Sequence, residues 1–128
     1  MATLRSHVLV DADPDAVWKV VGDAANIADW FPAMTASTGD DTRRTVTLRD
    51  GARLEEEVVT RDPVLRRFQY RVVGGDLGVE SHLGTVDVIE VPGAGSLVVY
   101  STEIEPASLA GAFDEAISEA VAGLPGFL

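Results

Sequence analysis

The stretch at residues 106–124, PASLAGAFDEAISEAVAGL, constrains the fold of the chain more than any other feature of the sequence. Its apolar residues recur at steps of three and four positions, which is the period of one face of an α-helix. These residues are Leu109, Ala112, Phe113, Ala116, Ile117, Ala120, Val121 and Leu124. Pro106 and Ser108 are typical of a helix start, and Gly123 followed by Pro125 is typical of a helix end. An amphipathic helix needs a surface that covers its apolar stripe, so the rest of the chain has to provide one.

That surface is predicted to be a β-sheet, because much of the chain before the helix alternates apolar and polar residues. The alternating stretches are Thr3–Val10, Thr42–Arg49, Ala52–Arg61, Arg67–Val73, Glu80–Val91 and Ser96–Glu105. Short turns such as Asp50-Gly51 join the later stretches, which indicates antiparallel pairing of successive strands. After the first strand, Asp13-Pro14 begins a short helix that runs to Gly22, and a second helix is predicted at Ala24–Trp30.

The expected order of elements is therefore β-α-α, a meander of strands, and the long helix. We expect an α+β fold in which a curved antiparallel sheet of six or seven strands wraps around the C-terminal helix, as a single domain over residues 1–128. The space between helix and sheet is where a ligand would fit.

Composition narrows the classes of partner. The formal net charge of −11 argues against nucleic acids and anionic membrane surfaces as partners. Cysteine is absent and only two histidines are present, without a metal-binding spacing, so we expect no disulfide, no metal and no cofactor. No signal peptide and no apolar run of membrane-spanning length is visible, so we expect a cytoplasmic protein without membrane insertion, as a monomer or homodimer.

Four local motifs sharpen the interpretation. They are VDADPDAVW at residues 10–18, NIADWFP at 26–32, LEEEVVTRD at 54–62 with RFQYRV at 67–72, and SHLGTV at 81–86. Their order and spacing resemble the START/Bet v 1-like (SRPBCC) superfamily, and within it the bacterial polyketide cyclase/dehydrase and lipid-transport family. The resemblance implies a helix-grip fold that encloses a cavity for lipids, polyketides or other apolar molecules. The C-terminal helix and the loops are short for such a fold, which predicts a small cavity.

Glu56 and His82 are the candidates for chemistry. Glu56 shares a strand face with Leu54, Val58 and Thr60, so an inward carboxylate would need a partner or a raised pKa. The alternative is an exposed acidic edge formed by residues 55–57. His82 lies on the same strand face as Gly84, Val86 and Val88, so its ring is expected to point inward. There it could orient a ligand or act as an acid or base. The alternative for His82 is a core histidine bonded to the backbone.

Six further residues are predicted to line the cavity. Tyr70 and Tyr100 lie on inward strand faces and carry hydroxyls that need partners when buried. Trp30, Met34, Phe113 and Ile117 would form the apolar walls, with plain core packing as the alternative for each. Arg61 lies in the region where the resemblance to aromatase/cyclase relatives places a catalytic arginine. The glycine-rich turn at residues 74–78 is a candidate gate for the cavity.

We favour a binding or carrier protein for a small hydrophobic molecule, oriented by Glu56, His82 and a tyrosine. The second hypothesis is a cofactor-independent polyketide cyclase, aromatase or dehydratase that uses Glu56 or His82 as acid/base. The third is an interaction module whose cavity has collapsed, with bulky side chains filling the interior.

Overall fold

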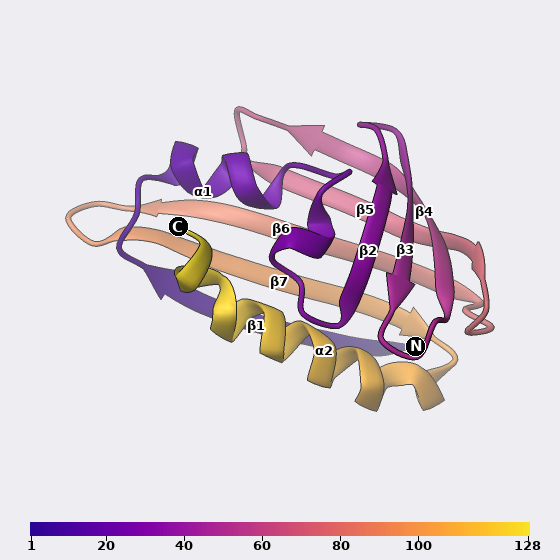
Figure 1. Ribbon diagram of the computed structural model, residues 1–128. Helices are drawn as coiled ribbons and strands as arrows, with labels where there is room; N and C mark the ends of the chain where they lie inside the picture. Colours follow the sequence, from indigo (N-terminus) through magenta and orange to yellow (C-terminus); the bar gives the residue numbers. More distant parts are fainter.

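The strands form one antiparallel sheet in the order β1-β7-β6-β5-β4-β3-β2, as seen in the computed structural model of residues 1–128 (Figure 1). The strands are β1 (Ala2–Val10), β2 (Met34–Gly39), β3 (Arg43–Leu48), β4 (Arg53–Asp62), β5 (Arg67–Gly75), β6 (Ser81–Val91) and β7 (Gly95–Glu105). The helices are α1 (Pro14–Val21) and α2 (Ala110–Gly123), with 3-10 turns at Ile27–Asp29, Ala107–Leu109 and Leu124–Phe127. The predicted helix-grip architecture is confirmed: a curled seven-stranded sheet grips a C-terminal helix.

The inner face of the sheet follows the predicted alternation. The buried inward residues of β5, β6 and β7 are Phe68, Tyr70, Val72, His82, Gly84, Val86, Val88, Ser96, Val98, Tyr100, Thr102 and Ile104. Bulges interrupt β2–β3 and β4–β5, and β2 and β3 run nearly across the direction of the long strands β6 and β7 (Figure 1). Because a bulge bends and twists its strand, these interruptions accompany the curl that turns the sheet around its own inner face.

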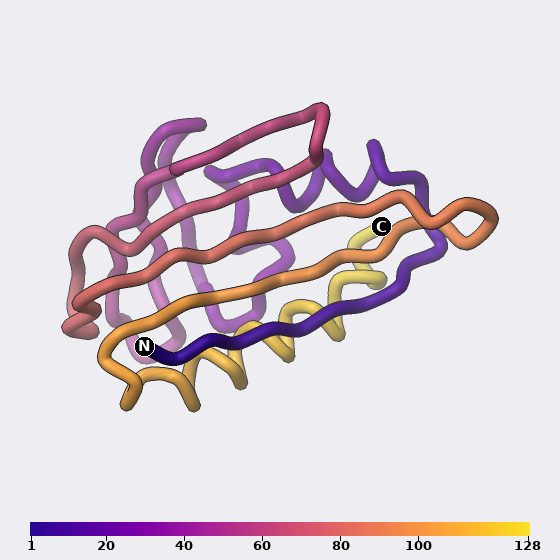
Figure 2. The backbone as a smooth tube through the Cα atoms, turned by 180° about the vertical axis from the view of Figure 1, so that it is seen from behind, coloured from indigo at the N-terminus to yellow at the C-terminus, as the bar shows by residue number.

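Helix α2 packs at the β1 edge of the sheet, and only half of its apolar stripe is fully buried. From behind, the tube of β1 crosses in front of α2 (Figure 2). Ile117, Ala120 and Val121 of the C-terminal half are buried, whereas Phe113 and Ala116 are partly exposed. The N-terminal half of the stripe therefore stands away from the sheet and borders a space. No helix of the chain is both long enough and apolar enough to cross a membrane.

Two helix predictions need correction. The expected helix at Ala24–Trp30 is reduced to the 3-10 turn Ile27–Asp29. Ser108 makes no capping bond, because it lies within the 3-10 turn that precedes α2 and not at an extended N-cap position. By contrast, Asp13 caps α1 as predicted: its side chain accepts a hydrogen bond from the Asp15 backbone N–H at 2.8 Å.

The predicted alternation in β4 fails after Val58. A bulge lies between Val58 and Thr60, so Thr60 pairs with Gln69 and donates its hydroxyl to the Gln69 side chain at 2.8 Å. Thr60 therefore lies on the outer face with Gln69, and not on the inner face with Glu56. The extra residue shifts the parity, which places Arg61 opposite the inward Phe68.

Gly84 provides the volume that Tyr70 occupies. A Cβ at position 84 would lie 2.5 Å from Cε1 of the Tyr70 ring, closer than any packed side chain tolerates. We expect Gly84→Ala to lower the free energy of unfolding by about 1–3 kcal/mol, as overpacked cores do, measured by urea denaturation. The control is Gly111→Ala on α2, where a Cβ meets nothing within 4 Å and stability should not fall. Equal stability of the two variants would contradict this packing.

Candidate functional site

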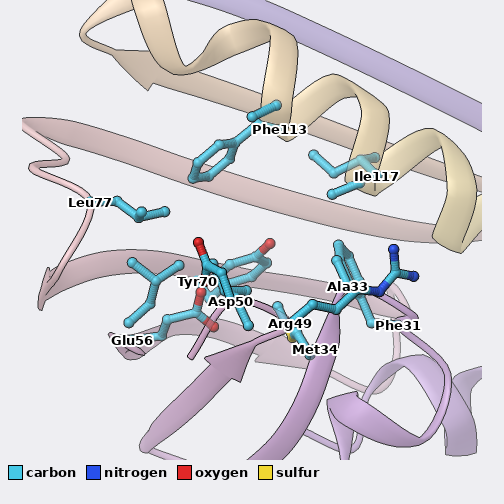
Figure 3. A pocket seen from close by; sticks show the side chains of 14 residues that line it. Phe31, Ala33, Met34, Arg49, Asp50, Glu56, Tyr70, Leu77, Phe113 and Ile117 are labelled. Atoms are coloured by element: carbon cyan, nitrogen blue, oxygen red, sulfur yellow. The ribbon is translucent and has the colours of Figure 1, made fainter. Parts of the chain in front are cut away.

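A cavity of about 300 Å³ lies between the N-terminal half of α2 and the inner face of β2, β3, β4 and β5. Eleven of its 14 lining residues are hydrophobic, so its walls suit an apolar molecule. The lining residues are Phe31, Ala33, Met34, Leu48, Arg49, Asp50, Leu54, Glu56, Tyr70, Leu77, Ala112, Phe113, Ala116 and Ile117. Phe113 and Ile117 point from α2 into this space, opposite Glu56 and Tyr70 (Figure 3). This open space differs from the filled interior that the third hypothesis requires.

An ion pair between Arg44 and Glu56 lies at the polar side of the cavity. The Arg44 Nε donates to Glu56 Oε1 at 2.7 Å, and the two side chains are 1% and 2% exposed. The Arg44 Nη1 donates to the Ala24 carbonyl at 3.0 Å, and the guanidinium lies 4.6 Å from the centre of the Tyr70 ring. The backbone places the partners, because Arg44 of β3 and Glu56 of β4 are opposite each other in the register.

Burial raises the pKa of Glu56 above its ordinary value, and the positive charge of Arg44 works against that rise. An arginine stays charged in proteins, so a protonated Glu56 would leave a buried cation without an anion. Near neutral pH the pair is therefore best described as ionised and neutral in sum.

Two tyrosines share a hydrogen bond deep in the site. The hydroxyls of Tyr70 and Tyr100 bond to each other, and either atom is able to donate. Burial raises the pKa of both phenols, so both stay protonated near neutral pH. Tyr70 borders the cavity, whereas Tyr100 lies behind it against Trp30 and Phe31 at ring-centre distances of 6.3 and 6.2 Å.

His82 is held by the backbone and does not line the cavity. Its Nδ1 accepts a hydrogen bond from the Val72 N–H at 3.1 Å, which assigns the ring proton to Nε2. Burial, and secondly the charge of Arg44, lower the pKa of His82 from 6.5 to about 4. The ring is therefore neutral near neutral pH and packs between Tyr70 and Phe113. This arrangement corresponds to the alternative of a core histidine bonded to the backbone.

Five of the eight predicted cavity residues border the cavity: Met34, Glu56, Tyr70, Phe113 and Ile117. The other three, Trp30, His82 and Tyr100, are buried behind it. That any of these eight residues contacts a ligand stays a prediction.

The sequence interpretation missed Arg44, which shares strand parity with the buried Val46. This shared strand face was the one sign in the sequence that Arg44 points inward. Arg61, the arginine singled out from the resemblance, lies elsewhere: its Nε donates to the Gly22 carbonyl at 2.9 Å, and its guanidinium lies over Trp18. Arg44 is therefore the arginine paired with Glu56, and Arg49 is the arginine that lines the cavity.

The opening of the cavity was also missed. Arg49, Asp50 and Ala112 are the exposed members of the lining and mark this opening. Arg49 donates to the Pro32 carbonyl at 3.1 Å and to Glu119 of α2 at 2.5 Å, so it joins the β3–β4 turn to the helix. Leu77 of the glycine-rich turn lines the cavity, and gating by that turn stays a prediction.

A second hollow of about 360 Å³ lies beside the ion pair, and Val73 is the one hydrophobic residue among the nine that line it. Arg44 and Glu56 border it, together with Asp40, Arg43 and Glu55 among others. Glu56 therefore stands between the apolar cavity and this polar hollow. No group of three or more His, Cys, Asp or Glu side chains is arranged to hold a metal ion.

Comparisons with known proteins agree with this architecture. The model of the family described as polyketide cyclase / dehydrase and lipid transport matches residues 1–124. The XoxI protein of Bacillus cereus superposes with a TM-score of 0.89 at 21% identity, over 99% of this chain and 95% of that one. A START superfamily protein of Mycobacterium smegmatis gives 0.77 at 15% identity, over 98% and 95%.

The di-domain ARO/CYC BexL from the BE-7585A biosynthetic pathway gives a TM-score of 0.80 at 21% identity, over 98% of this chain and 46% of that one. At such identities these similarities show the fold alone. No curated protein matches the sequence.

The ion pair leads to a double-mutant test. Arg44→Met alone leaves Glu56 as an unpaired buried charge, so we expect a loss of about 3–5 kcal/mol in unfolding free energy. The double variant Arg44→Met/Glu56→Leu removes both charges and should recover most of that loss, measured by urea denaturation. The exposed pair Arg43–Glu57 is the control, and Glu57→Gln should change stability by less than about 1 kcal/mol. A double variant no more stable than Arg44→Met would contradict the argument.

His82 leads to a pH test. Its folded-state pKa lies below the ordinary value of 6.5, so the unfolded state binds the proton first and stability falls as the pH drops from 6.5 toward about 4. We expect His82 to account for a loss of about 3 kcal/mol over this range. His82→Asn keeps an acceptor for the Val72 N–H but does not titrate, so its denaturation midpoints should depend less on pH.

The control for this test is His7→Asn on the exposed face of β1, which should retain the pH dependence of the unchanged protein. If His82→Asn and His7→Asn lose stability equally on acidification, His82 is not the titrating group.

Proposed function

The chain belongs to the polyketide cyclase / dehydrase and lipid transport family, and we propose that it binds a small, mostly apolar molecule in the cavity beneath α2. The cavity itself carries this proposal: apolar walls from α2 and four strands surround a few polar groups. Such a combination is how proteins usually hold small ligands, because the walls supply affinity and the polar groups supply orientation.

The size of the cavity limits the ligand. Its volume of about 300 Å³ is at the lower end of the range for small-molecule sites. A compact ring compound or a short acyl group suits this volume better than a long-chain lipid.

Binding is preferred to catalysis because the candidate acid/base groups are already engaged. Glu56 is paired with Arg44, His82 is neutral and behind the cavity wall, and the phenol of Tyr70 stays protonated. A general base needs free access to the proton that it removes, and of Glu56 and His82 only Glu56 borders the ligand space.

A cyclase or dehydratase is the second candidate, and one arrangement favours it. Glu56 and Tyr70 both border the cavity, and the Arg44 cation lies beside each of them. The fold is also that of the aromatase/cyclase BexL. In this reading Glu56 exchanges a proton with a polyketide-like substrate while Tyr70 donates a hydrogen bond to its carbonyl.

Filling the cavity tests the binding proposal. Ala116 of α2 lines the cavity, so Ala116→Phe places a ring in the ligand space. We expect this variant to weaken binding of the neutral fluorescent probe N-phenyl-1-naphthylamine at least about tenfold, because the probe and the new ring compete for the same volume. Probe fluorescence titration measures the affinity.

The matched control is Ala122→Phe, which adds the same ring on the exposed side of the same helix. It should bind the probe as the unchanged protein does. Equal affinities for both variants, or no probe binding by the unchanged protein, would count against the cavity as a binding site.

A further inference from the structure

One carboxylate oxygen at the side of the cavity has no partner within the protein. Glu56 Oε1 accepts the hydrogen bond from Arg44 Nε, whereas Oε2 accepts none. The Glu56 side chain is 2% exposed overall, yet the residue borders the cavity, opposite Phe113 and Ile117 (Figure 3). A ligand in the cavity that covers this oxygen takes it out of contact with water, and a covered acceptor without a donor is costly. A ligand that brings a donor to Oε2 therefore gains more than one that does not.

The charge on this side of the cavity is already balanced. Arg44 compensates Glu56, and because Arg44 itself does not border the cavity, a ligand there meets the pair through Glu56. Arg49 at the opening is paired with Glu119. A ligand carboxylate placed beside Glu56 would put two anions on one cation, which disfavours acidic ligands.

Tyr70 adds a second polar contact to the same cavity. Its hydroxyl bonds to that of Tyr100, and a phenol oxygen has more hydrogen-bonding capacity than this one bond uses. A ligand hydroxyl both donates and accepts, so it is able to satisfy a carboxylate and to bond to a phenol. A ketone or ester only accepts and leaves Glu56 Oε2 without a donor.

We infer that the ligand of this cavity is a neutral, compact molecule bearing an alcohol or phenol hydroxyl that donates a hydrogen bond to Oε2 of Glu56. The inference rests on the proposed binding function and narrows it to a ligand class. Glu56 is then the residue that determines specificity, and Arg44 is the residue that positions it.

Three probes with the same apolar ring system test this inference: 1-naphthol, 1-methylnaphthalene and 1-naphthoate, each competing with N-phenyl-1-naphthylamine near neutral pH. We expect 1-naphthol to bind about tenfold or more tightly than either of the others, because a hydrogen bond to a buried charge adds that much affinity.

Glu56→Gln should invert the order of the two polar probes. The amide keeps the shape of the side chain but removes the negative charge, so the Arg44 cation is left uncompensated. 1-Naphthoate should then bind more tightly than 1-naphthol. The matched control is Glu57→Gln, which removes the same charge from an exposed neighbour and should preserve the original order.

A second variant covers the case in which Glu56→Gln does not fold. Arg44→Met/Glu56→Leu removes both charges, and in this variant 1-naphthol should lose its advantage over 1-methylnaphthalene.

The outcomes separate this inference from the proposed function. If 1-methylnaphthalene or 1-naphthoate binds the unchanged protein as tightly as 1-naphthol does, the inference is wrong and the binding function stands. If neither the three probes nor N-phenyl-1-naphthylamine binds, the proposed function fails, and the inference fails with it.

Discussion

The buried pair of Arg44 and Glu56 is the interaction on which the interior of this protein depends. Removing two charges from water is costly, and the cost is offset only where geometry and further hydrogen bonds are good. Here the strand register places Arg44 of β3 opposite Glu56 of β4. The Ala24 carbonyl accepts a further hydrogen bond from the guanidinium, and the Tyr70 ring packs against it. Four segments far apart in the sequence therefore meet at one guanidinium. Moving any of these segments would cost the guanidinium one of its contacts, and moving β3 away from β4 would leave a buried charge unpaired.

The cavity exists because only one half of the apolar stripe of α2 packs against the sheet. The C-terminal half of α2 packs against the sheet through Ile117, Ala120 and Val121. The N-terminal half carries small residues such as Ala112 and Ala116, which do not reach across to the bent strands β3 and β4. The same amphipathic pattern thus anchors the helix at one end and leaves a space at the other.

Much of this arrangement could be predicted from the sequence, because strands joined by short turns keep their alternation. The inward positions of Tyr70, His82 and Tyr100 followed from parity alone. The errors arose where a bulge interrupts the alternation of a strand, or where a charged residue occupies a buried position. Nothing in the composition marks the bulge after Val58, which moves Thr60 to the outer face. Arg44 was overlooked because an arginine on a strand is expected in solvent, and only its partner across the sheet explains its burial.

The position of Glu56 between the apolar cavity and the polar hollow has a kinetic meaning. The ion pair lies on that side, and the exposed lining residues Arg49, Asp50 and Ala112 mark an opening elsewhere. A molecule that passes this opening inward has to pass it again outward. Widening it would therefore speed association and dissociation by the same factor and leave the equilibrium constant unchanged. For a ligand bound as proposed, residues at the opening would set how fast it exchanges, whereas residues of the cavity wall would set how strongly it binds.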